Sequence, residues 1–255
     1  MQNSHVQLSQ LLMRGFSFKT AEGDKVRYLD LNDNTIKEEK VNKIDAIPGY
    51  FDEDVEQQLA NIESKFGEVI LKFKNFQKKE INFMLSKNDL NVIYCFFDCL
   101  ILRNEKMAAL SEKSSVILSS FDATHSDVLR WYDYNDKSYR ILGDKKVNIL
   151  VNRTDMNFVL PRNGFYYVRK NGEYEYVLPL NKKVAIIMMD EKLYGEHRYG
   201  DILEYAYIDS DEEIKKFNDM AYYAEKDMNN KFVIGNKDEL KRLQKLGQWV
   251  WLSKK

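Results

Sequence analysis

Apolar residues recur at helical spacing in the stretch that follows residue 54 of the chain. Their 3.6-residue period would place them on one face of an α-helix. Asp52 and Asp54 precede the stripe, and either side chain can cap the start of the helix. The sequence therefore predicts an amphipathic helix whose buried face consists of Val55, Leu59, Ile62, Phe66, Val69 and Ile70.

A second helix is predicted to begin at Ser86. Ser86 and Asp89 have capping-box spacing, which marks a helix start. The apolar run 90–102 follows, and we expect the helix to continue to about Lys113. Because this helix is apolar nearly all round, it should lie in the centre of its domain. A weaker amphipathic segment at 126–134 predicts a third helix.

Strand patterns lie on both sides of these helices. Residues 25–31 and 35–41 flank the turn formers Asn32 to Asn34, a pattern that predicts a β-hairpin. After about Lys137, short β-rich runs separated by turn signals recur, and they predict a mostly antiparallel sheet.

The last part of the chain returns to helical spacing. Ser210 and Glu213 form another capping-box pattern, which predicts a helix to about Glu225. A strand at 231–235 and a short helix at 238–246 are expected to follow.

These elements predict an α+β fold in a single domain of residues 1–255. The helical N-terminal half, residues 1–135, would begin with the small β-hairpin. It would pack on the C-terminal half, residues 136–255, which holds the mostly antiparallel sheet and a terminal helix.

Composition narrows the cellular setting more than the activity. The chain is 44% hydrophobic and 31% charged, with a net charge of −1, so it lacks a field that would attract nucleic acid or an acidic membrane. Its longest apolar run has 13 residues, too few to cross a bilayer. The start of the sequence lacks a signal peptide, and two cysteines supply no disulfide framework. We therefore expect a cytoplasmic protein without membrane contact, and its Lys-, Asn- and Ile-rich composition suggests a bacterial or phage origin.

Glu56 and Glu63 are the first candidates for chemistry, because they lie on one side of the first predicted helix. At 100° per residue they differ by about 20° in azimuth and lie roughly 10 Å apart along the helix axis. Both sit on the shoulder of the apolar stripe. They can point into a cleft, or they can edge the helix with their carboxylates in water. We expect at least Glu63 to contact the second predicted helix, which leads to Arg103, because consecutive helices joined by a short loop usually pack antiparallel.

Other reactive residue types form no specific motif. Cys95 and Cys99 have the i, i+4 spacing of a metal pair but no second pair nearby, so they are interpreted as buried thiols. His5, His125 and His197 do not form a zinc signature. The sequence contains no phosphate-binding glycine loop and no nucleophile elbow, so no cofactor is predicted.

The order of several short motifs resembles the bacterial domain-of-unknown-function (DUF) family numbered forty-two thirty-eight. That family opens with a histidine, a proline and an L-x-x-F motif. Here His5 is followed by Leu12 and Phe16, whose spacing is one residue longer, and Leu8 stands where the proline would be. An aromatic pair and a glutamate helix follow in the family, similar to Tyr50, Phe51, Glu56, Ile62 and Glu63. An arginine ends the next helix, as Arg103 does here.

The resemblance continues through the C-terminal half. The family's F-[IV]-x-S-D-N-P turn is similar to the stretch FVLPRNGFYY, in which Arg162 replaces the aspartate and Gly164 the proline. A "PLSP"-like strand entrance is similar to VLPLNKK. A helical asparagine before a short strand matches Asn218 and KFVIG.

Two classes of function fit these observations. In the first, the resemblance would bring His5, Glu56, Glu63, Arg103 and Asn163 into one cleft between the two halves. Such a set can hydrolyse a phosphodiester, with the carboxylates as metal ligands or base and the arginine on the phosphate. The metal, if any, is unknown.

In the second class, which we favour, the chain binds a macromolecular partner without catalysis. Tyrosines are frequent in the sheet half, and an aromatic strand face is a common recognition surface. A protein partner in a bacterial or phage defence setting would fit, whereas a nucleic-acid partner stays open. The residues are Tyr166, Tyr167, Tyr174, Tyr176, Tyr205 and Tyr207.

Overall fold

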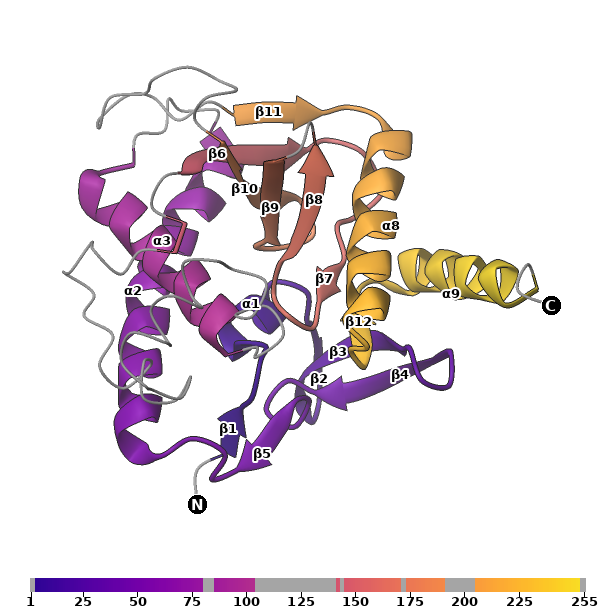
Figure 1. Ribbon diagram of the computed structural model, residues 1–255, viewed down its shortest axis with the longest axis horizontal. Helices are drawn as coiled ribbons and strands as arrows, with labels where there is room; N and C mark the ends of the chain where they lie inside the picture. The colour runs from indigo at the N-terminus through magenta and orange to yellow at the C-terminus, as the bar shows by residue number, and fades with distance from the viewer. Residues whose placement is uncertain are drawn as a thin grey trace. The chain divides into compact units, whose positions relative to one another are not determined.

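The computed structural model contains helices together with antiparallel and parallel strand pairs, so the fold is α+β (Figure 1). It describes residues 3–79, 85–103, 141–142, 145–170, 173–190 and 205–252. The predicted helix at 126–134, His125 and His197 lie outside these residues.

The chain forms two compact units, and each is assembled from three stretches of sequence. The first comprises Met1–Gln7, Asp45–Val147 and Met189–Glu204, and the second comprises Leu8–Ile44, Asn148–Met188 and Tyr205–Lys255. The units therefore do not coincide with the predicted halves 1–135 and 136–255, because the N-terminal hairpin belongs with C-terminal segments. The single-domain assignment stays a prediction.

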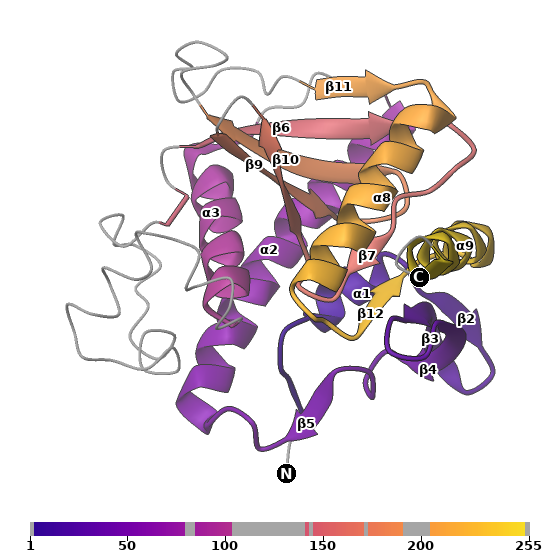
Figure 2. The ribbon, with the colours of Figure 1, turned by 45° about the vertical axis from the view of Figure 1, so that its right-hand side comes forward.

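Two helices dominate the first unit, α2 (Glu53–Lys79) and α3 (Lys87–Leu102). They lie side by side (Figure 2), and the rings of Phe66 and Phe96 stack between them with centroids 3.9 Å apart. Of the two predicted caps, Asp52 accepts the Val55 N–H at 3.0 Å. The same unit contains a two-stranded antiparallel sheet of β1 (Asn3–His5) and β5 (Ala46–Pro48).

The burial expected of α3 is confirmed. Ile93, Phe97 and Leu100 are at most 1% exposed. The Ser86–Asp89 capping box is present, but α3 ends at Leu102 with Arg103 as its C-cap, earlier than the predicted Lys113. Asp98, also buried, accepts the backbone N–H groups of Ile141 and Leu142 at 3.2 and 3.4 Å, which satisfies a carboxylate inside an apolar helix.

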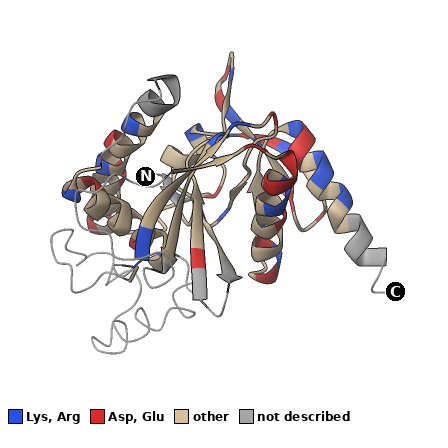
Figure 3. Cartoon of the chain, turned by 90° about the horizontal axis from the view of Figure 1, so that it is seen from above, with Lys and Arg blue, Asp and Glu red and all other residues tan. Residues whose placement is uncertain are grey.

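A five-stranded sheet has most of its residues in the second unit. Its order is β11-β6-β10-β9-β8, and Figure 3 shows that its strands carry few charged residues. β9 pairs antiparallel with β8 and β10, whereas β11 is parallel to β6, so the predicted sheet is mixed at one edge. The strands are β6 (Lys145–Asn152), β8 (Tyr166–Lys170), β9 (Glu173–Pro179), β10 (Val184–Asp190) and β11 (Tyr205–Ile208).

A second sheet of five strands contains segments from both the N-terminal and the C-terminal parts of the chain. The predicted hairpin is confirmed as β3 and β4, joined by a turn in which Asn34 has a positive φ of 55°. β3 also pairs with β12, which lies about 200 residues later in the sequence. The strands are β2 (Phe18–Thr20), β3 (Gly23–Asp30), β4 (Thr35–Lys40), β7 (Leu160–Pro161) and β12 (Phe232–Ile234).

Three helices accompany the sheets of the second unit: α1 (Gln10–Arg14), α8 (Asp211–Asp227) and α9 (Lys237–Leu252). α8 packs on β7, β8 and β12, and α9 packs on β3 and β4. The predicted start of α8 is confirmed, but the Ser210 side chain makes no capping hydrogen bond. The predicted capping box is therefore wrong, although the acidic first turn still favours the helix start through the helix dipole.

Candidate functional site

Glu63 and Arg103 form an ion pair between α2 and α3. The Nη2 group of Arg103 donates to Glu63 Oε1 at 2.7 Å. The Arg103 side chain is 4% exposed and the Glu63 side chain 25%, so the pair lies at the margin of the helix interface. The predicted contact between Glu63 and the end of the second helix is confirmed, as expected for consecutive helices joined by a short connection.

Arg103 has more hydrogen-bonding capacity than this pair uses. Its Nε and Nη1 groups are buried and have no partner within the described part of the chain. On α2, the Oε1 atom of Glu56 is likewise buried without a partner there. Buried polar groups are normally satisfied, so unused donors on a guanidinium are a reason to consider an anionic ligand.

The composite site of all five predicted residues stays a prediction. His5 is in β1, where its backbone pairs with Ala46, and its side chain lies outside the described residues. Asn163 belongs to the second compact unit, whereas Glu56, Glu63 and Arg103 belong to the first. Only Glu63 and Arg103, of the five, are joined by a hydrogen bond that the structure describes.

Asn163 is a structural residue of a buried turn. It is 3% exposed, and its backbone N–H donates to Glu225 Oε1 on α8 at 3.3 Å. Gly164 follows with a positive φ of 82°, a conformation that glycine adopts without strain. The turn is thus specified by backbone geometry and by a carboxyl group of the neighbouring helix.

Two further side chains hold the segment that leads into this turn. Asn218 of α8 donates its Nδ2 to the Asn157 carbonyl at 2.8 Å and accepts the Val159 N–H at 3.0 Å. Glu239 of α9 accepts the Asn157 backbone N–H at 2.9 Å and its side-chain amide at 3.1 Å. Asn218, the helical asparagine named in the family resemblance, therefore binds backbone groups that a neighbouring strand would otherwise pair with.

Glu225 is the most perturbed carboxyl group of this cluster. Its exposed fraction is 0%, and burial raises its pKa to about 8. The Asn163 N–H and the charge of Arg162 oppose the shift, and Asn230 also favours the charged form without good hydrogen-bond geometry. Glu225 therefore holds a proton at neutral pH, and without solvent contact we assign it a structural role.

Sequence reasoning overlooked Glu225, although the helical pattern contains the signal. The buried face of α8 repeats at i, i+4, i+7, i+8 and i+11 from Ile214. Two polar residues fall on that face, and each holds backbone of the 157–163 segment. The buried residues are Ile214, Asn218, Ala221, Tyr222 and Glu225.

Cysteine and metal chemistry have no support in the described residues. Cys95 and Cys99 are buried reduced thiols, and burial raises the pKa of Cys99, which keeps its thiol protonated. No cluster of three or more His, Cys, Asp or Glu suited to a metal ion occurs in the described part of the chain. No described helix has the length and apolar character needed to cross a membrane.

The tyrosine-rich strands present little aromatic surface. Tyr166 is 2% exposed, Tyr167 and Tyr176 are half-buried, and only Tyr207 reaches 37% among the four with described side chains. The Tyr207 ring is covered by the Arg153 guanidinium, 3.2 Å from its centroid. These four rings form no continuous recognition face, and the side chains of Tyr174 and Tyr205 lie outside the described residues.

A different apolar surface lies beside β5 in the first unit. Ile47 is 49% exposed and Tyr50 is 48% exposed, and Pro48 lies between them on the surface. In the described residues β5 pairs only with β1, so its second edge has no strand neighbour. We call Ile47, Pro48 and Tyr50 the β5 surface.

The segment that begins at Asp45 and runs through β5 into α2 is acidic in sequence. Residues 45–64 contain six Asp and Glu residues and no Lys or Arg, whereas the whole chain has a net charge of −1. Glu53 and Asp54, in the first turn of α2, are exposed. The composition of the whole chain conceals this local excess of negative charge.

Comparison with known proteins adds no relative. No protein-family model, curated protein or solved structure significantly matches the chain.

Proposed function

We propose that the chain acts by binding a protein partner through the β5 surface. The observation that carries this proposal is the exposure of Ile47 and Tyr50, nearly half of each side chain, beside a strand edge without a neighbour. Exposed apolar residues grouped at one place are typical of interaction surfaces. The acidic surroundings oppose binding of nucleic acid, because phosphates would be repelled.

The chemistry of this surface suits recognition better than catalysis. Tyrosine and isoleucine bury a large apolar area on binding, worth about 25 cal/mol per Å² before the costs of association. Tyr50 is already held by an edge-to-face contact with Phe51, whose ring centroid lies 4.9 Å away. A ring that is fixed before binding loses less side-chain entropy in a complex.

Selection from a displayed random-peptide library tests this proposal. Peptides selected on the wild-type protein should bind an Ile47→Ala/Tyr50→Ala variant at least about tenfold more weakly, a loss of about 1.4 kcal/mol. The matched control is Leu71→Ala/Tyr223→Ala, which removes two other exposed apolar residues. Failure to select any peptide, or equal losses in both variants, would reject the β5 surface.

A metal-assisted phosphodiester hydrolase is the second candidate, favoured by the unused Nε and Nη1 donors of Arg103. In this mechanism Glu63 or Glu56 accepts the proton of an attacking water. The water oxygen bonds to phosphorus as the bond to the leaving oxygen breaks, and the leaving oxygen takes up a proton from the glutamic acid or from water. Arg103 stabilises the phosphate charge.

Incubation with RNA, DNA and nucleotides, with and without Mg²⁺, tests the hydrolase directly. Activity should disappear in Glu63→Gln and persist in Glu68→Gln, a change at an exposed glutamate of the same helix. Complete stability of all substrates under both conditions would reject this candidate. It would leave the binding proposal unaffected.

Membership of the DUF family and a defence role in a bacterial or phage cytoplasm belong to the same proposal. They are supported by the order of short motifs along the chain and by the two buried reduced cysteines.

A further inference from the structure

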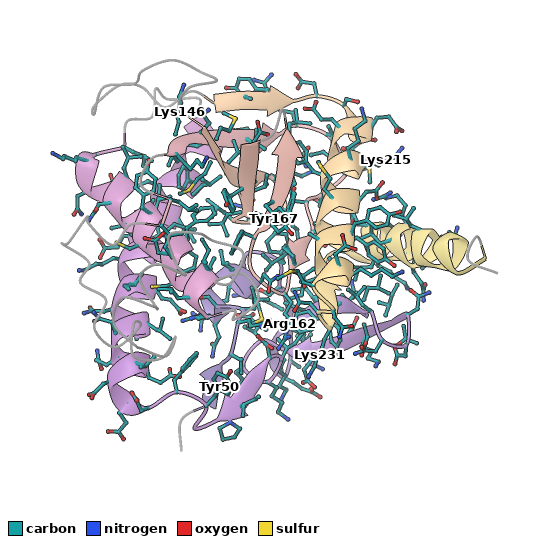
Figure 4. All side chains as sticks on the ribbon, viewed as in Figure 1. Tyr50, Lys146, Arg162, Tyr167, Lys215 and Lys231 are labelled. Carbon is teal, nitrogen blue, oxygen red and sulfur yellow. The ribbon has the colours of Figure 1, made fainter. Side chains whose placement is uncertain are left out.

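We infer that the β5 surface receives an extended, positively charged segment of a protein partner. This inference rests on the proposed binding function and adds the chemistry of the partner. Its basis is the combination of an unpaired strand edge, an exposed tyrosine and a dense local negative charge. Figure 4 labels Tyr50, which lies on the segment between β5 and α2.

The local negative charge predicts the sign of the charge on the partner. Of the six carboxylates in residues 45–64, Glu63 is matched by Arg103. Glu53 and Asp54 are exposed directly after the β5 surface. A basic segment would therefore be attracted and oriented there, whereas an acidic segment would meet like charges.

The strand register identifies which backbone groups of β5 face outward. Val6 N–H donates to the Asp45 carbonyl at 3.0 Å, and Ser4 is the register partner of Ile47. Hydrogen-bonded and non-bonded pairs alternate in an antiparallel ladder, so Asp45 and Ile47 point their backbone groups toward β1. The outward groups are then the N–H and carbonyl of Ala46 and the carbonyl of Pro48.

This short edge favours limited strand addition supplemented by side-chain contacts. Pro48 has no N–H, so the ladder that an added strand can form is brief. Specificity must then come from side chains, and Tyr50 offers an aromatic face for an Arg or Lys of the partner. Ile47 offers an apolar contact for an alternate side chain of an extended peptide.

Two labelled peptides of opposite charge test the inference, one alternating Arg and Val and the other alternating Glu and Val. Fluorescence anisotropy should detect binding of the Arg-Val peptide and at least about tenfold weaker binding of the Glu-Val peptide. Affinity for the Arg-Val peptide should decrease from 0.1 M to 1 M salt, as the Debye length falls from about 10 Å to about 3 Å.

Matched variants locate the binding site. Tyr50→Ala and the pair Glu53→Gln/Asp54→Asn should each weaken binding of the Arg-Val peptide by about fivefold to tenfold. Tyr223→Ala and the pair Asp211→Asn/Glu213→Gln should not, although they remove another exposed tyrosine, 38% exposed against 48% for Tyr50, and two exposed acids from the first turn of α8. Equal losses in the control variants would show general electrostatic attraction and overturn the inference.

The outcomes separate this inference from the function on which it rests. If both peptides bind equally and Tyr50→Ala weakens both, the β5 surface binds partners but does not select positive charge. If neither peptide binds while library-selected peptides do, the basic segment is rejected and the binding function stands. If no peptide of any kind binds, both the inference and the proposed binding function are rejected.

Discussion

Glu63 and Glu225 are both carboxyl groups on long helices, and the protein accommodates them in opposite ways. Glu63 retains 25% exposure and pairs with Arg103 at 2.7 Å. Glu225 is fully buried, has backbone N–H groups as its neighbours, and has a pKa raised to about 8. Glu63 meets a guanidinium at the margin of the helix interface, whereas Glu225, which has no full counter-charge, takes up a proton.

The raised pKa of Glu225 is expected to make the stability of the protein depend on pH. The pKa of Glu225 is raised from 4.5 to about 8, so between these values the folded protein keeps a proton that the unfolded chain releases. Its stabilising contribution is complete below about pH 4.5 and is lost as the pH rises through about 8. The whole change is on the order of 5 kcal/mol, at about 1.36 kcal/mol per pKa unit.

Urea unfolding of the wild type and Glu225→Gln from about pH 5 to about pH 9 measures this contribution. Glutamine cannot ionise, so the variant should lose less stability than the wild type as the pH rises. Parallel profiles for the two proteins would show that Glu225 does not titrate in this range. The contrast with Glu63 would then disappear.

Asn218, also in the second unit, holds the same 157–163 segment as Glu225 but carries no charge. Asn218→Ala leaves the Val159 N–H and the Asn157 carbonyl without the partners they now have. Each unsatisfied buried group costs about 1–3 kcal/mol, so we expect a loss of at least about 2 kcal/mol, independent of pH. Asn218→Asp keeps only the acceptor. Its free energy of unfolding in chemical denaturation should lie between those of the wild type and Asn218→Ala.

Glu63→Gln tests the first unit. Neutralising Glu63 leaves the buried Arg103 guanidinium without its counter-charge, a change that costs 3–5 kcal/mol in fully buried pairs. Because Glu63 is 25% exposed, we expect a smaller loss of about 1–3 kcal/mol in thermal or urea unfolding. The double variant Glu63→Gln/Arg103→Met should recover part of that loss, and failure to do so would mean that the loss does not come from the unpaired guanidinium.

The elements that sequence predicted well are those specified by neighbouring residues. The stripe that starts at Val55 and the Ser86 capping box located α2 and α3, and Asn34 located the hairpin turn. The Glu63–Arg103 contact followed from these, since two consecutive helices usually pack antiparallel. Local patterns were enough because every contact involved lies within one helix pair or one turn.

Pairings between distant segments could not be predicted in the same way. β3 pairs with β12, and β11 is parallel to β6, although none of these strands carries a residue that specifies its partner. Glu225 was missed for a related reason. Its burial depends on the 157–163 turn, far away in sequence, and an acidic residue near a helix end is usually solvated.

Glu56→Gln is expected to have the smallest effect on stability. Comparing it with Glu63→Gln shows whether the stability loss at Glu63 comes from its place on α2 or from its ion pair with Arg103. The two residues share one side of the helix about two turns apart, but no ion pair of Glu56 is present in the described part of the chain. Glu56 is half-buried, and Gln keeps the size of its side chain without removing an ion pair that the structure describes. Glu56→Gln should therefore change the free energy of unfolding by no more than about 0.5 kcal/mol. Urea unfolding beside Glu63→Gln checks this, and a loss as large as that of Glu63→Gln would show that Arg103 is not what distinguishes them.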